Sequence, residues 1–409
     1  MNHHQVAVTG LGVMAPHGDE PHALFDALLQ GRSAIQPIFP ELPKPAAAAL
    51  VAFDETRWFT KLQLAGVDRV SQLAVAAADL AMRDAGLSLG AKDADAGADP
   101  ERVGVYAGCG MGGAAALEAA YRGNGRVSPL TIPAFMPNAP AAHVAMRNGV
   151  LGPVLTYSVA CASSSVAIAE AAKAIQRGEV DIAIAGGSEA LIVPGVVLAW
   201  QAMQTLATFQ PGEAAGAVRP FASDRSGFAL GEGAAFLVLE SAERARRRGA
   251  RSYATLAGWG LSSDATHLTK PDAPGQARAL RQALRQAGLQ ARDVGYCNAH
   301  GTATRIGDVV ERNALAEVWG DDLDSLRVSS TKALHGHMLG AAGAIEAVVT
   351  VMALHRRELP PNAHCQEIDA ACGLNLVQSG DTAAPALKAA MSNSFAFGGT
   401  NSVLLFRSP

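Results

Sequence analysis

The cysteine best placed to act as a nucleophile is Cys161, which lies between an apolar segment at residues 153–160 and an Ala- and Ser-rich segment at residues 162–177. We expect the first to be a strand and the second a helix that is apolar or small on nearly every side, and therefore buried. A cysteine at a helix start gains from the positive end of the helix dipole, which favours the nucleophilic thiolate. Backbone N–H groups freed at the same turn can bind an oxyanion. The alternative is an inert buried cysteine.

Two further segments carry histidines. His300 lies in NAHGTATRIGD, after a strand expected at residues 294–298, and so at the strand end where α/β folds build their sites. His335 and His337 flank a glycine in SSTKALHGHMLGAAG, just ahead of a small-residue helix expected at residues 339–355. His300 could equally be a satisfied core residue, and the other two a solvated pair or half of a metal site. A metal is disfavoured because no carboxylate or cysteine sits beside them at ligand spacing.

The last candidate segment, NSFAFGGTN, places Phe395 and Phe397 before paired glycines. A backbone without Cβ atoms can approach a ligand closely and offer it an N–H. The alternative is an ordinary hairpin turn with core aromatics. A glycine-rich turn in the segment at residues 102–113 resembles a nucleotide-binding GxGxxG loop only loosely, and it lacks the other features of a Rossmann unit.

The segments around these residues indicate an α/β chain of two tandem halves. The first half is expected to contain strands and helices at residues 5–12, 70–86, 102–113, 153–160, 162–177 and 180–187. The second is expected to contain them at residues 277–288, 294–298, 327–330, 339–355 and 386–407. We therefore expect one half over residues 1–250 and another over residues 251–409. A basic, exposed stretch at residues 242–249 is expected to be the end of a helix, followed by a linker between the two halves.

The amino-acid composition limits the class of protein, the partners and the compartment that can be expected. The 409 residues are 49% hydrophobic and 17% charged, which is typical of a globular chain rather than a disordered one. The net charge of −4 argues against nucleic acid as a partner. Five scattered cysteines without a CxxC pair indicate neither a disulfide framework nor a zinc ribbon. The N-terminal residues lack the pattern of a signal peptide, and no uninterrupted apolar run is long enough to span a bilayer, so we expect a cytoplasmic protein.

Together, Cys161, NAHGT, STK…GH and NSFAFGGTN occur in an order that resembles the elongating β-ketoacyl-acyl-carrier-protein synthases of the thiolase-like superfamily. The resemblance runs from VAVTGLGVMAP to NSFAFGGTN, which is essentially the whole chain. It implies a thiolase-like five-layered αβαβα fold of two similar halves, the first carrying the nucleophilic cysteine and the second the two histidines.

The resemblance also implies an activity. This is the decarboxylative Claisen condensation of an acyl thioester with malonyl-acyl-carrier protein, which extends the chain by two carbons in fatty acid, type II polyketide or aryl polyene biosynthesis. The implied substrates are carried on the phosphopantetheine of an acyl-carrier protein, with no metal or organic cofactor. The implied assembly is a homodimer, or a heterodimer with a subunit like a chain-length factor.

Roles follow from the resemblance by position. Cys161 matches the nucleophile, and the N–H groups of Cys161 and Phe397 match an oxyanion hole, with Phe397 also matching a gating aromatic. His300 and His337 match two neutral histidines that stabilise the enolate by hydrogen bonds. The matching supporting residues are Lys332, Glu346, Asp308 and Glu311. The expected substrate-binding residues are Thr302, Thr304 and Thr269 on the pantetheine arm, together with Met111, Thr131 and Phe395.

The chain departs from the family pattern at several places. They are His335 (commonly threonine), Ala396 (usually glycine), Arg305 (often proline), Thr131 (usually phenylalanine), Gln204 (commonly arginine) and residues 65–66 (a basic pair). The Cβ of Ala396 narrows the conformations open to the gate. Thr131 matches a position at the dimer interface, near the floor of the acyl pocket, where a smaller residue leaves room for a longer or stiffer acyl chain. Lost basic residues alter the surface that meets an acidic carrier, which favours a specialised carrier or partner subunit. His335 is assigned no catalytic role.

Several alternatives are weighed against this interpretation. A degradative thiolase has the same fold but needs a second cysteine in the C-terminal loop, where this chain has NSFAFGG. The initiating synthases use a Cys-His-Asn set, against which the pair Gly336–His337 argues. A non-catalytic chain-length factor loses the nucleophile, whereas Cys161, His300, His337 and Lys332 are all present. A carrier-binding protein with a relic site would be distinguished from an enzyme by iodoacetamide labelling of Cys161 with loss of activity. A ketosynthase that is active only with a chain-length-factor partner stays open.

Overall fold

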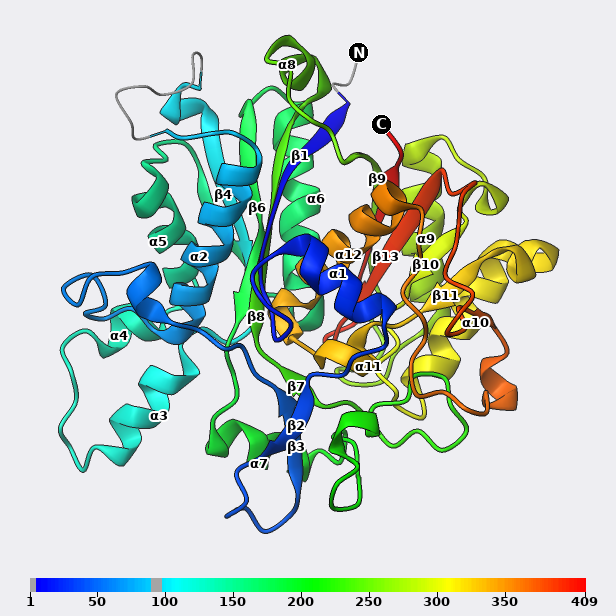
Figure 1. Cartoon of the computed structure of the whole chain (residues 1–409), viewed down its shortest axis with the longest axis horizontal. Helices are drawn as coiled ribbons and strands as arrows, with labels where there is room; N and C mark the ends of the chain where they lie inside the picture. The colour runs from blue at the N-terminus through cyan, green and yellow to red at the C-terminus, as the bar shows by residue number, and fades with distance from the viewer. Residues whose placement is uncertain (1–4, 90–97) are drawn as a thin grey trace.

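The computed structural model of the chain describes residues 5–89 and 98–409, and a large mixed sheet forms its centre (Figure 1). Among these residues the strand order is β12-β11-β10-β13-β14-β9-β1-β8-β6-β4-β5. The strands are β1 (Val6–Met14), β4 (Val103–Gly108), β5 (Val154–Tyr157), β6 (Ile182–Glu189), β8 (Gly233–Ser241), β9 (Ala254–Ser263), β10 (Tyr296–Asn298), β11 (Arg327–Ser329), β12 (Asn375–Leu376), β13 (Ala389–Phe395) and β14 (Thr400–Arg407).

One pattern of strand pairing occurs twice in this sheet. In the first half β1 pairs antiparallel with β8 and β8 with β6, and β6–β4–β5 then run parallel. In the second half β9 pairs antiparallel with β14 and β14 with β13, and β13–β10–β11 then run parallel. The two sets meet where β1 pairs antiparallel with β9 over three residues. The boundary that we predict after residue 250 falls just before β9 and stays a prediction.

The helices form three layers around the two sets of strands, which confirms the expected αβαβα arrangement (Figure 1). Helices α2 (Arg69–Asp84) and α5 (Ala139–Asn148) cover the outer face of the first set. Helices α9 (Ala273–Ala287) and α10 (Gly307–Trp319) lie on the outer side of the second, where α9 packs on β9 and β14. Helices α6 (Ser163–Gln176) and α12 (Ala342–Arg356) lie between the two sets and contact each other.

The central helices have the composition that their position requires. Every residue of α12 from Ala342 to Leu354 is buried, so a polar face would find no water. Among the described residues, one segment (Leu339–Arg356) has the length and apolar composition of a membrane-crossing helix, and 89% of it is buried inside the protein. Its apolar character is therefore explained by the two sets of strands that enclose α12.

Shorter elements complete the chain. They are α1 (Pro21–Leu29), α3 (Ala114–Arg122), α4 (Thr131–Phe135), α7 (Pro194–Ala202), α8 (Ala242–Arg247), α11 (Lys332–His335), the 3-10 turns η3 (Ala160–Ala162) and η7 (Leu339–Ala341), and a small sheet of β2 (Ile35–Ile38), β3 (Ala46–Ala49) and β7 (Leu230–Gly231). Residues 242–247 of the basic stretch thus form a helix, α8, which packs on β1 and β8, and the helix ends in a turn at residues 248–249. Residues 1–4 of the N-terminal sequence lie outside the described residues.

Candidate active site

A strained turn presents Cys161 between β5 and α6. The preceding residue, Ala160, has a φ of +49°, which a side chain with a Cβ rarely adopts. Ser163 secures the turn because its Oγ donates to Ala160 O at 2.6 Å and accepts the N–H of Val159 at 2.9 Å. The Cys161 side chain therefore sits at the start of the central helix, as expected from the sequence, and the residue is only 7% exposed.

Strand β4 packs directly against this helix start. A Cβ placed on Gly108, the last residue of β4, would lie 2.2 Å from the backbone nitrogen of Ser164. Real Cβ atoms do not approach backbone atoms so closely, so only glycine allows β4 and α6 to lie at this separation. The position of Cys161 thus depends on a glycine in a neighbouring strand.

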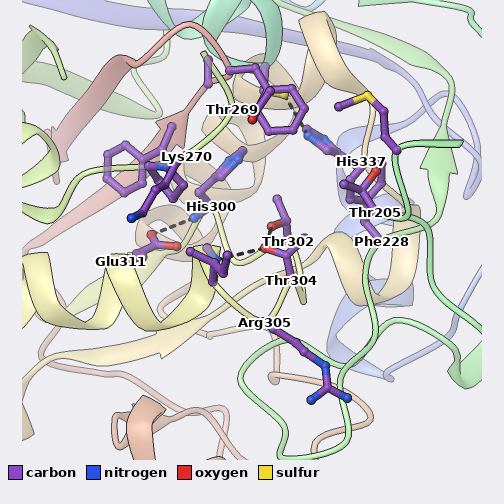
Figure 2. Close-up of a pocket in the computed structure, with 18 of the residues that line it drawn as sticks. Thr205, Phe228, Thr269, Lys270, His300, Thr302, Thr304, Arg305, Glu311 and His337 are labelled. Carbon is purple, nitrogen blue, oxygen red and sulfur yellow. Dashed lines mark hydrogen bonds between the residues drawn. The ribbon is translucent and has the colours of Figure 1, made fainter. Parts of the chain in front are cut away.

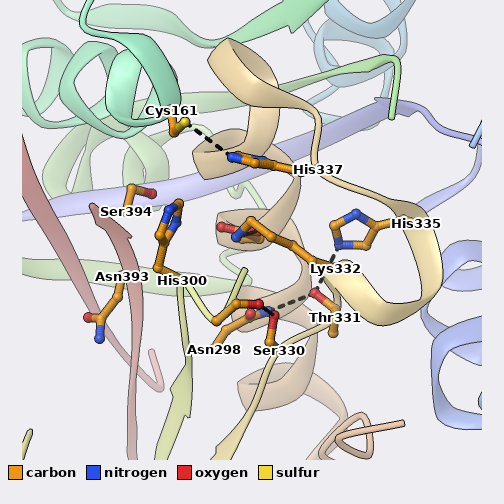
Figure 3. Close-up of polar contacts among 12 residues, drawn as sticks. Cys161, Asn298, His300, Ser330, Thr331, Lys332, His335, His337, Asn393 and Ser394 are labelled. Carbon is orange, nitrogen blue, oxygen red and sulfur yellow. Dashed lines mark hydrogen bonds and ion pairs between the residues drawn. The ribbon is translucent and has the colours of Figure 1, made fainter. Parts of the chain in front are cut away.

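His337 donates a hydrogen bond to the sulfur of Cys161 (Figure 3). Its Nε2 lies 3.1 Å from Cys161 Sγ, and its Nδ1 accepts the N–H of Leu339 at 3.3 Å. Because Nδ1 uses its lone pair as an acceptor, the proton of the neutral ring is on Nε2, which faces the sulfur. Burial and the nearby Lys332 ammonium hold the pKa of His337 well below its usual value, so the ring is neutral.

His300 follows β10 and faces the ring of His337 edge-on. The two ring centroids are 5.5 Å apart with an interplanar angle of 81°. Glu311, on α10, fixes the backbone here by accepting the N–H groups of His300 at 2.9 Å and Gly301 at 2.8 Å. Asn393 on β13 donates to the same carboxylate at 3.0 Å. Burial, followed by Lys332 and His337, also lowers the pKa of His300 well below its usual value.

The spacing of the three side chains raises the question of a metal. One potential ligand atom from each of Cys161, His300 and His337 lies within 4.8 Å of the others. A metal needs the lone pair of an imidazole nitrogen, but Nε2 of His337 carries the proton in the tautomer that the Leu339 N–H selects. The arrangement therefore suits hydrogen-bond donation better than metal ligation.

Lys332 and Glu346 form a fully buried ion pair behind the histidines. Burial raises the pKa of Glu346 to about 7, and the Lys332 ammonium opposes that rise. The same ammonium lowers the pKa values of both His300 and His337. Lys332 therefore favours the neutral form of both His300 and His337. A neutral imidazole ring can donate a hydrogen bond from one nitrogen and accept one at the other.

The protonation state of Cys161 differs from the sequence expectation. We expected the helix start to favour a thiolate, but burial raises the pKa of the Cys161 thiol to about 12. Lys332 and a hydrogen bond from the Phe397 N–H lower this pKa without cancelling the effect of burial. The resting sulfur is therefore a thiol at neutral pH, and its proton would have to leave if the sulfur acted as a nucleophile.

A cavity of about 400 Å³ opens onto these side chains (Figure 2). Of the residues singled out in the sequence, those that line it are Cys161, Gln204, Thr269, His300, Thr302, Thr304, Arg305, Glu311, His337, Phe395, Ala396 and Phe397. The hydroxyl oxygens of Thr302 and Thr304 lie 3.1 Å apart on one wall. Thr269 is exposed on the segment opposite, where its N–H donates to His267 Nδ1 at 3.1 Å.

Met111 and Thr131, which we expected to bind substrate, lie outside this cavity. Met111 follows β4 and is 50% exposed, with its N–H bonded to Glu189 at 3.3 Å. Thr131 begins α4 and borders a separate surface hollow beside Leu130. A single chain therefore brings most of the expected residues together and leaves these two on its surface. Asp308 is buried beside the site, where it accepts the Phe221 N–H at 2.7 Å.

Among the residues near the site that were not predicted, three contact or support its groups. Trp200 on α7 stacks on Phe397, with centroids 6.0 Å apart and an interplanar angle of 28°. Phe228 meets the His337 ring edge-on at 5.2 Å. Glu189 is fully buried and accepts the N–H groups of Gly110 and Gly340. Of these three, only Glu189 could have been recognised from the sequence, because it is a lone carboxylate at the end of a buried apolar strand.

Family models match the chain as the N-terminal domain of beta-ketoacyl synthase over residues 3–245 and as its C-terminal domain over residues 253–366. Nodulation protein E of Rhizobium sp. (strain N33) is 40% identical over 98% of this chain and 99% of its own length. The 3-oxoacyl-[acyl-carrier-protein] synthase 2 of Staphylococcus aureus (strain COL) is 36% identical over 98% of each chain.

Solved structures agree in fold. A chain of the ishigamide ketosynthase/chain length factor has a TM-score of 0.90 and 31% identity over 100% of both chains. A chain of AntDE:AntF, a type II PKS acyl-carrier protein in complex with its ketosynthase bound to the hexaketide, has a TM-score of 0.90 and 29% identity, covering 99% of this chain and 100% of its own. From its family models, relatives and layered architecture, the chain belongs to the beta-ketoacyl synthase family.

Proposed function

We propose that this condensing enzyme uses Cys161 to take up an acyl chain and His300 and His337 to generate the attacking enolate from a malonyl thioester. The observation that carries the proposal is the convergence of one thiol and two neutral imidazoles in one cavity. His337 Nε2 lies 3.1 Å from Cys161 Sγ, and the two histidine rings lie 5.5 Å apart. A nucleophile beside fixed hydrogen-bond donors suits acyl transfer through a covalent intermediate.

In the first half-reaction, the Cys161 sulfur attacks the carbonyl of an acyl thioester. The new C–S bond forms as the old one breaks, and the proton of the Cys161 thiol ends on the departing pantetheine sulfur. The Nε2–H of His337 stabilises negative charge on the Cys161 sulfur during the attack. The Phe397 N–H, which already bonds this sulfur, becomes available to the carbonyl oxygen as charge develops there.

In the second half-reaction, a malonyl thioester loses carbon dioxide. The electrons of the broken C–C bond form an enolate, whose oxygen accepts hydrogen bonds from the neutral rings of His300 and His337. The enolate carbon attacks the acyl carbonyl on Cys161, and the C–S bond breaks. The Cys161 thiolate takes a proton from water, and the product leaves as a 3-oxoacyl thioester that is two carbons longer.

An acyl-carrier protein is the partner that this cavity suits. Its phosphopantetheine arm would pass Thr302, Thr304 and Thr269, whose side chains line the cavity. The cavity lining also contains three exposed apolar side chains, which we call the apolar rim: Met203 (45% exposed), Leu268 (73%) and Ile306 (57%). A carrier that delivers its arm to Cys161 must cover this rim. Apolar contact would then replace part of the attraction between an acidic carrier and basic residues on the synthase. The proposal places the reaction in the cytoplasm.

A second subunit would cover the far edge of the sheet. Strand β5 ends the strand order, and its Val154 and Leu155 are 39% and 45% exposed on that unpaired edge. Helices α3 and α4, which connect to β5 through α5, carry further exposed apolar side chains, Tyr121 and Ile132. A second copy of the chain, or a subunit like a chain-length factor, would bury this apolar surface. Sedimentation of the purified chain distinguishes a homodimer from a monomer that awaits a different partner.

Two variants assign the half-reactions to their residues. Cys161→Ala should take up no acyl group but still release carbon dioxide from malonyl-carrier protein, because the enolate donors remain. His300→Ala should be acylated at Cys161 and lose carbon dioxide release. Radiolabelled malonyl-carrier protein and intact-protein mass measure the two steps separately. The assignment is contradicted if Cys161→Ala is acylated, or if His300→Ala releases carbon dioxide at the wild-type rate.

A ketosynthase that works only beside a chain-length factor is the second candidate. It is favoured by the similarity to the ishigamide ketosynthase/chain length factor and by Thr131, which borders a separate surface hollow rather than the cavity. Whether the product belongs to fatty acid or to specialised metabolism follows from which acyl-carrier protein acylates Cys161 fastest. Activity that appears only when a partner subunit is added would select this second candidate.

A further inference from the structure

His335 is fully buried, and its hydrogen bonds form a chain with one direction (Figure 3). Its Nδ1 lies 2.8 Å from Gly336 O, and because a carbonyl only accepts, the proton is on Nδ1. Its Nε2 therefore accepts the hydroxyl proton of Thr331, whose Oγ1 lies 2.9 Å away. Thr331 Oγ1 in turn accepts from Asn298 Nδ2 at 3.3 Å. The donors thus run from Asn298 through Thr331 and His335 to Gly336.

Each member of this chain lies next to a residue of the active site. Asn298 ends β10, two residues before His300. Thr331 directly precedes Lys332, and Gly336 directly precedes His337. The hydrogen bonds through Thr331 and His335 therefore link the segment that carries His300 to the segment that carries both Lys332 and His337.

The backbone on either side of His337 is fixed by other contacts. The N–H of His337 donates to Ala229 O at 2.8 Å, and its carbonyl accepts the N–H of Gly231 at 2.9 Å. A rotation of the peptide between Gly336 and His337 about its long axis would break the hydrogen bond from the His337 N–H to Ala229 O, and it would also displace Gly336 O. The hydrogen bond from His335 Nδ1 to Gly336 O opposes that rotation.

We propose that His335 is a positioning residue, which holds the Nε2 of His337 against the sulfur of Cys161 through its hydrogen bond to Gly336 O. The inference rests on the proposed function for the role of His337. His335 does not line the substrate cavity, so its loss should lower kcat and leave the KM for malonyl-carrier protein almost unchanged. A small displacement of a reacting group slows catalysis strongly, and we expect a loss of about tenfold or more.

Two variants separate positioning from mere packing. His335→Asn places an amide N–H near the position of Nδ1 and keeps the donor to Gly336. His335→Gln reaches toward Thr331 and loses that donor. We expect His335→Asn to keep kcat within about threefold of wild type and His335→Gln to lose about tenfold, with similar thermal midpoints for both. Equal kcat values in the two variants, or a kcat that follows only the thermal midpoint, would overturn the proposal.

A second readout does not depend on turnover. In spectra of the protein labelled with ¹⁵N-histidine, His337 should show one Nε2–H tautomer in wild type and in His335→Asn, and a mixture of tautomers in His335→Gln. A His337 signal that is the same in all three proteins would also overturn the positioning role. A wild-type protein that shows the expected tautomer but elongates no acyl chain would instead contradict the proposed function.

Discussion

At the sulfur of Cys161 two influences oppose each other. Burial raises the pKa of the thiol to about 12, while Lys332 and the Phe397 N–H lower it. On the proposed mechanism, the site keeps the nucleophile as a thiol. It stabilises the charged sulfur only during acyl transfer, when the proton passes to the departing pantetheine sulfur. A neutral His337 whose Nε2–H already points at the sulfur provides this stabilisation without moving.

The histidines should remain neutral well into the acidic range. Burial lowers the pKa of both His300 and His337, so each ring gains its second proton only far below the ordinary pKa of 6.5. We predict that their ¹⁵N ring signals do not titrate from about pH 8 to about pH 6. Free histidine in the same sample provides the reference, and His300→Asn and His337→Asn assign the signals. A midpoint near 6.5 for either ring would contradict the account of its burial.

The sequence predicted the residues proposed to react better than the residues that surround them. Cys161 and His300 stand at element boundaries that local patterns reveal, and the structure brings both into one cavity. Trp200 and Phe228 reach the site from segments whose contacts cross long stretches of chain, so no local pattern marks them. Thr131 was expected at a subunit interface near the acyl pocket. It lies on the surface of the single chain, outside the cavity, so its contact with substrate stays a prediction.

Among the elements, the buried helices were the most predictable. A helix that is small or apolar all round has to lie between two layers, and α6 and α12 do so. Strands β8 and β9 were not predicted although they lie near the middle of the sheet. In the sequence alone, the glycines of β9 argue against a strand. In the fold they are needed, because a Cβ on Gly260 would lie 1.8 Å from Ala279 O of α9. The glycine is required by close packing, which only the tertiary structure reveals.

The contact between β4 and α6 gives a prediction at this scale. Gly108→Ala should push the start of α6 away from β4, because the new Cβ would lie 2.2 Å from Ser164 N. We expect the free energy of unfolding in urea to fall by about 1–3 kcal/mol and the acylation rate of Cys161 to fall with it. Gly216→Ala is the matched control, since a Cβ there meets no atom within 4 Å. Wild-type acylation in Gly108→Ala would show that the helix start does not depend on this contact.

In the whole molecule, the five layers decide which side chains can meet. Cys161 comes from the first set of strands and helices, whereas both histidines come from the second, so neither half contains the complete site. The central helices α6 and α12 lie against each other and keep the two sets of side chains in register. The layered class was predictable from alternating segments, but the meeting of the halves needed the family resemblance, because spacing along the chain does not specify it.

The apolar rim predicts how the carrier is recognised. Leu268→Asp or Ile306→Asp should raise the KM for acyl-carrier protein about tenfold, because a charge replaces an exposed apolar contact at the cavity. The same variants should use a small acyl-pantetheine thioester as well as wild type does, since that substrate needs no docking. Met146→Asp, at an exposed apolar residue on α5, is the control and should change neither value. Equal losses with both substrates would place these residues in the chemistry instead.

The central claim is that Cys161 carries the growing chain, and intact-protein mass spectrometry tests it most directly. The purified protein is incubated with a panel of acyl-carrier proteins, alone and with a candidate partner subunit, and malonyl-carrier protein is then added. The account predicts one acyl group on Cys161, followed by its loss and the appearance of a 3-oxoacyl-carrier protein two carbons longer. If Cys161 acquires no acyl group from any donor under either condition, the account of this site is wrong.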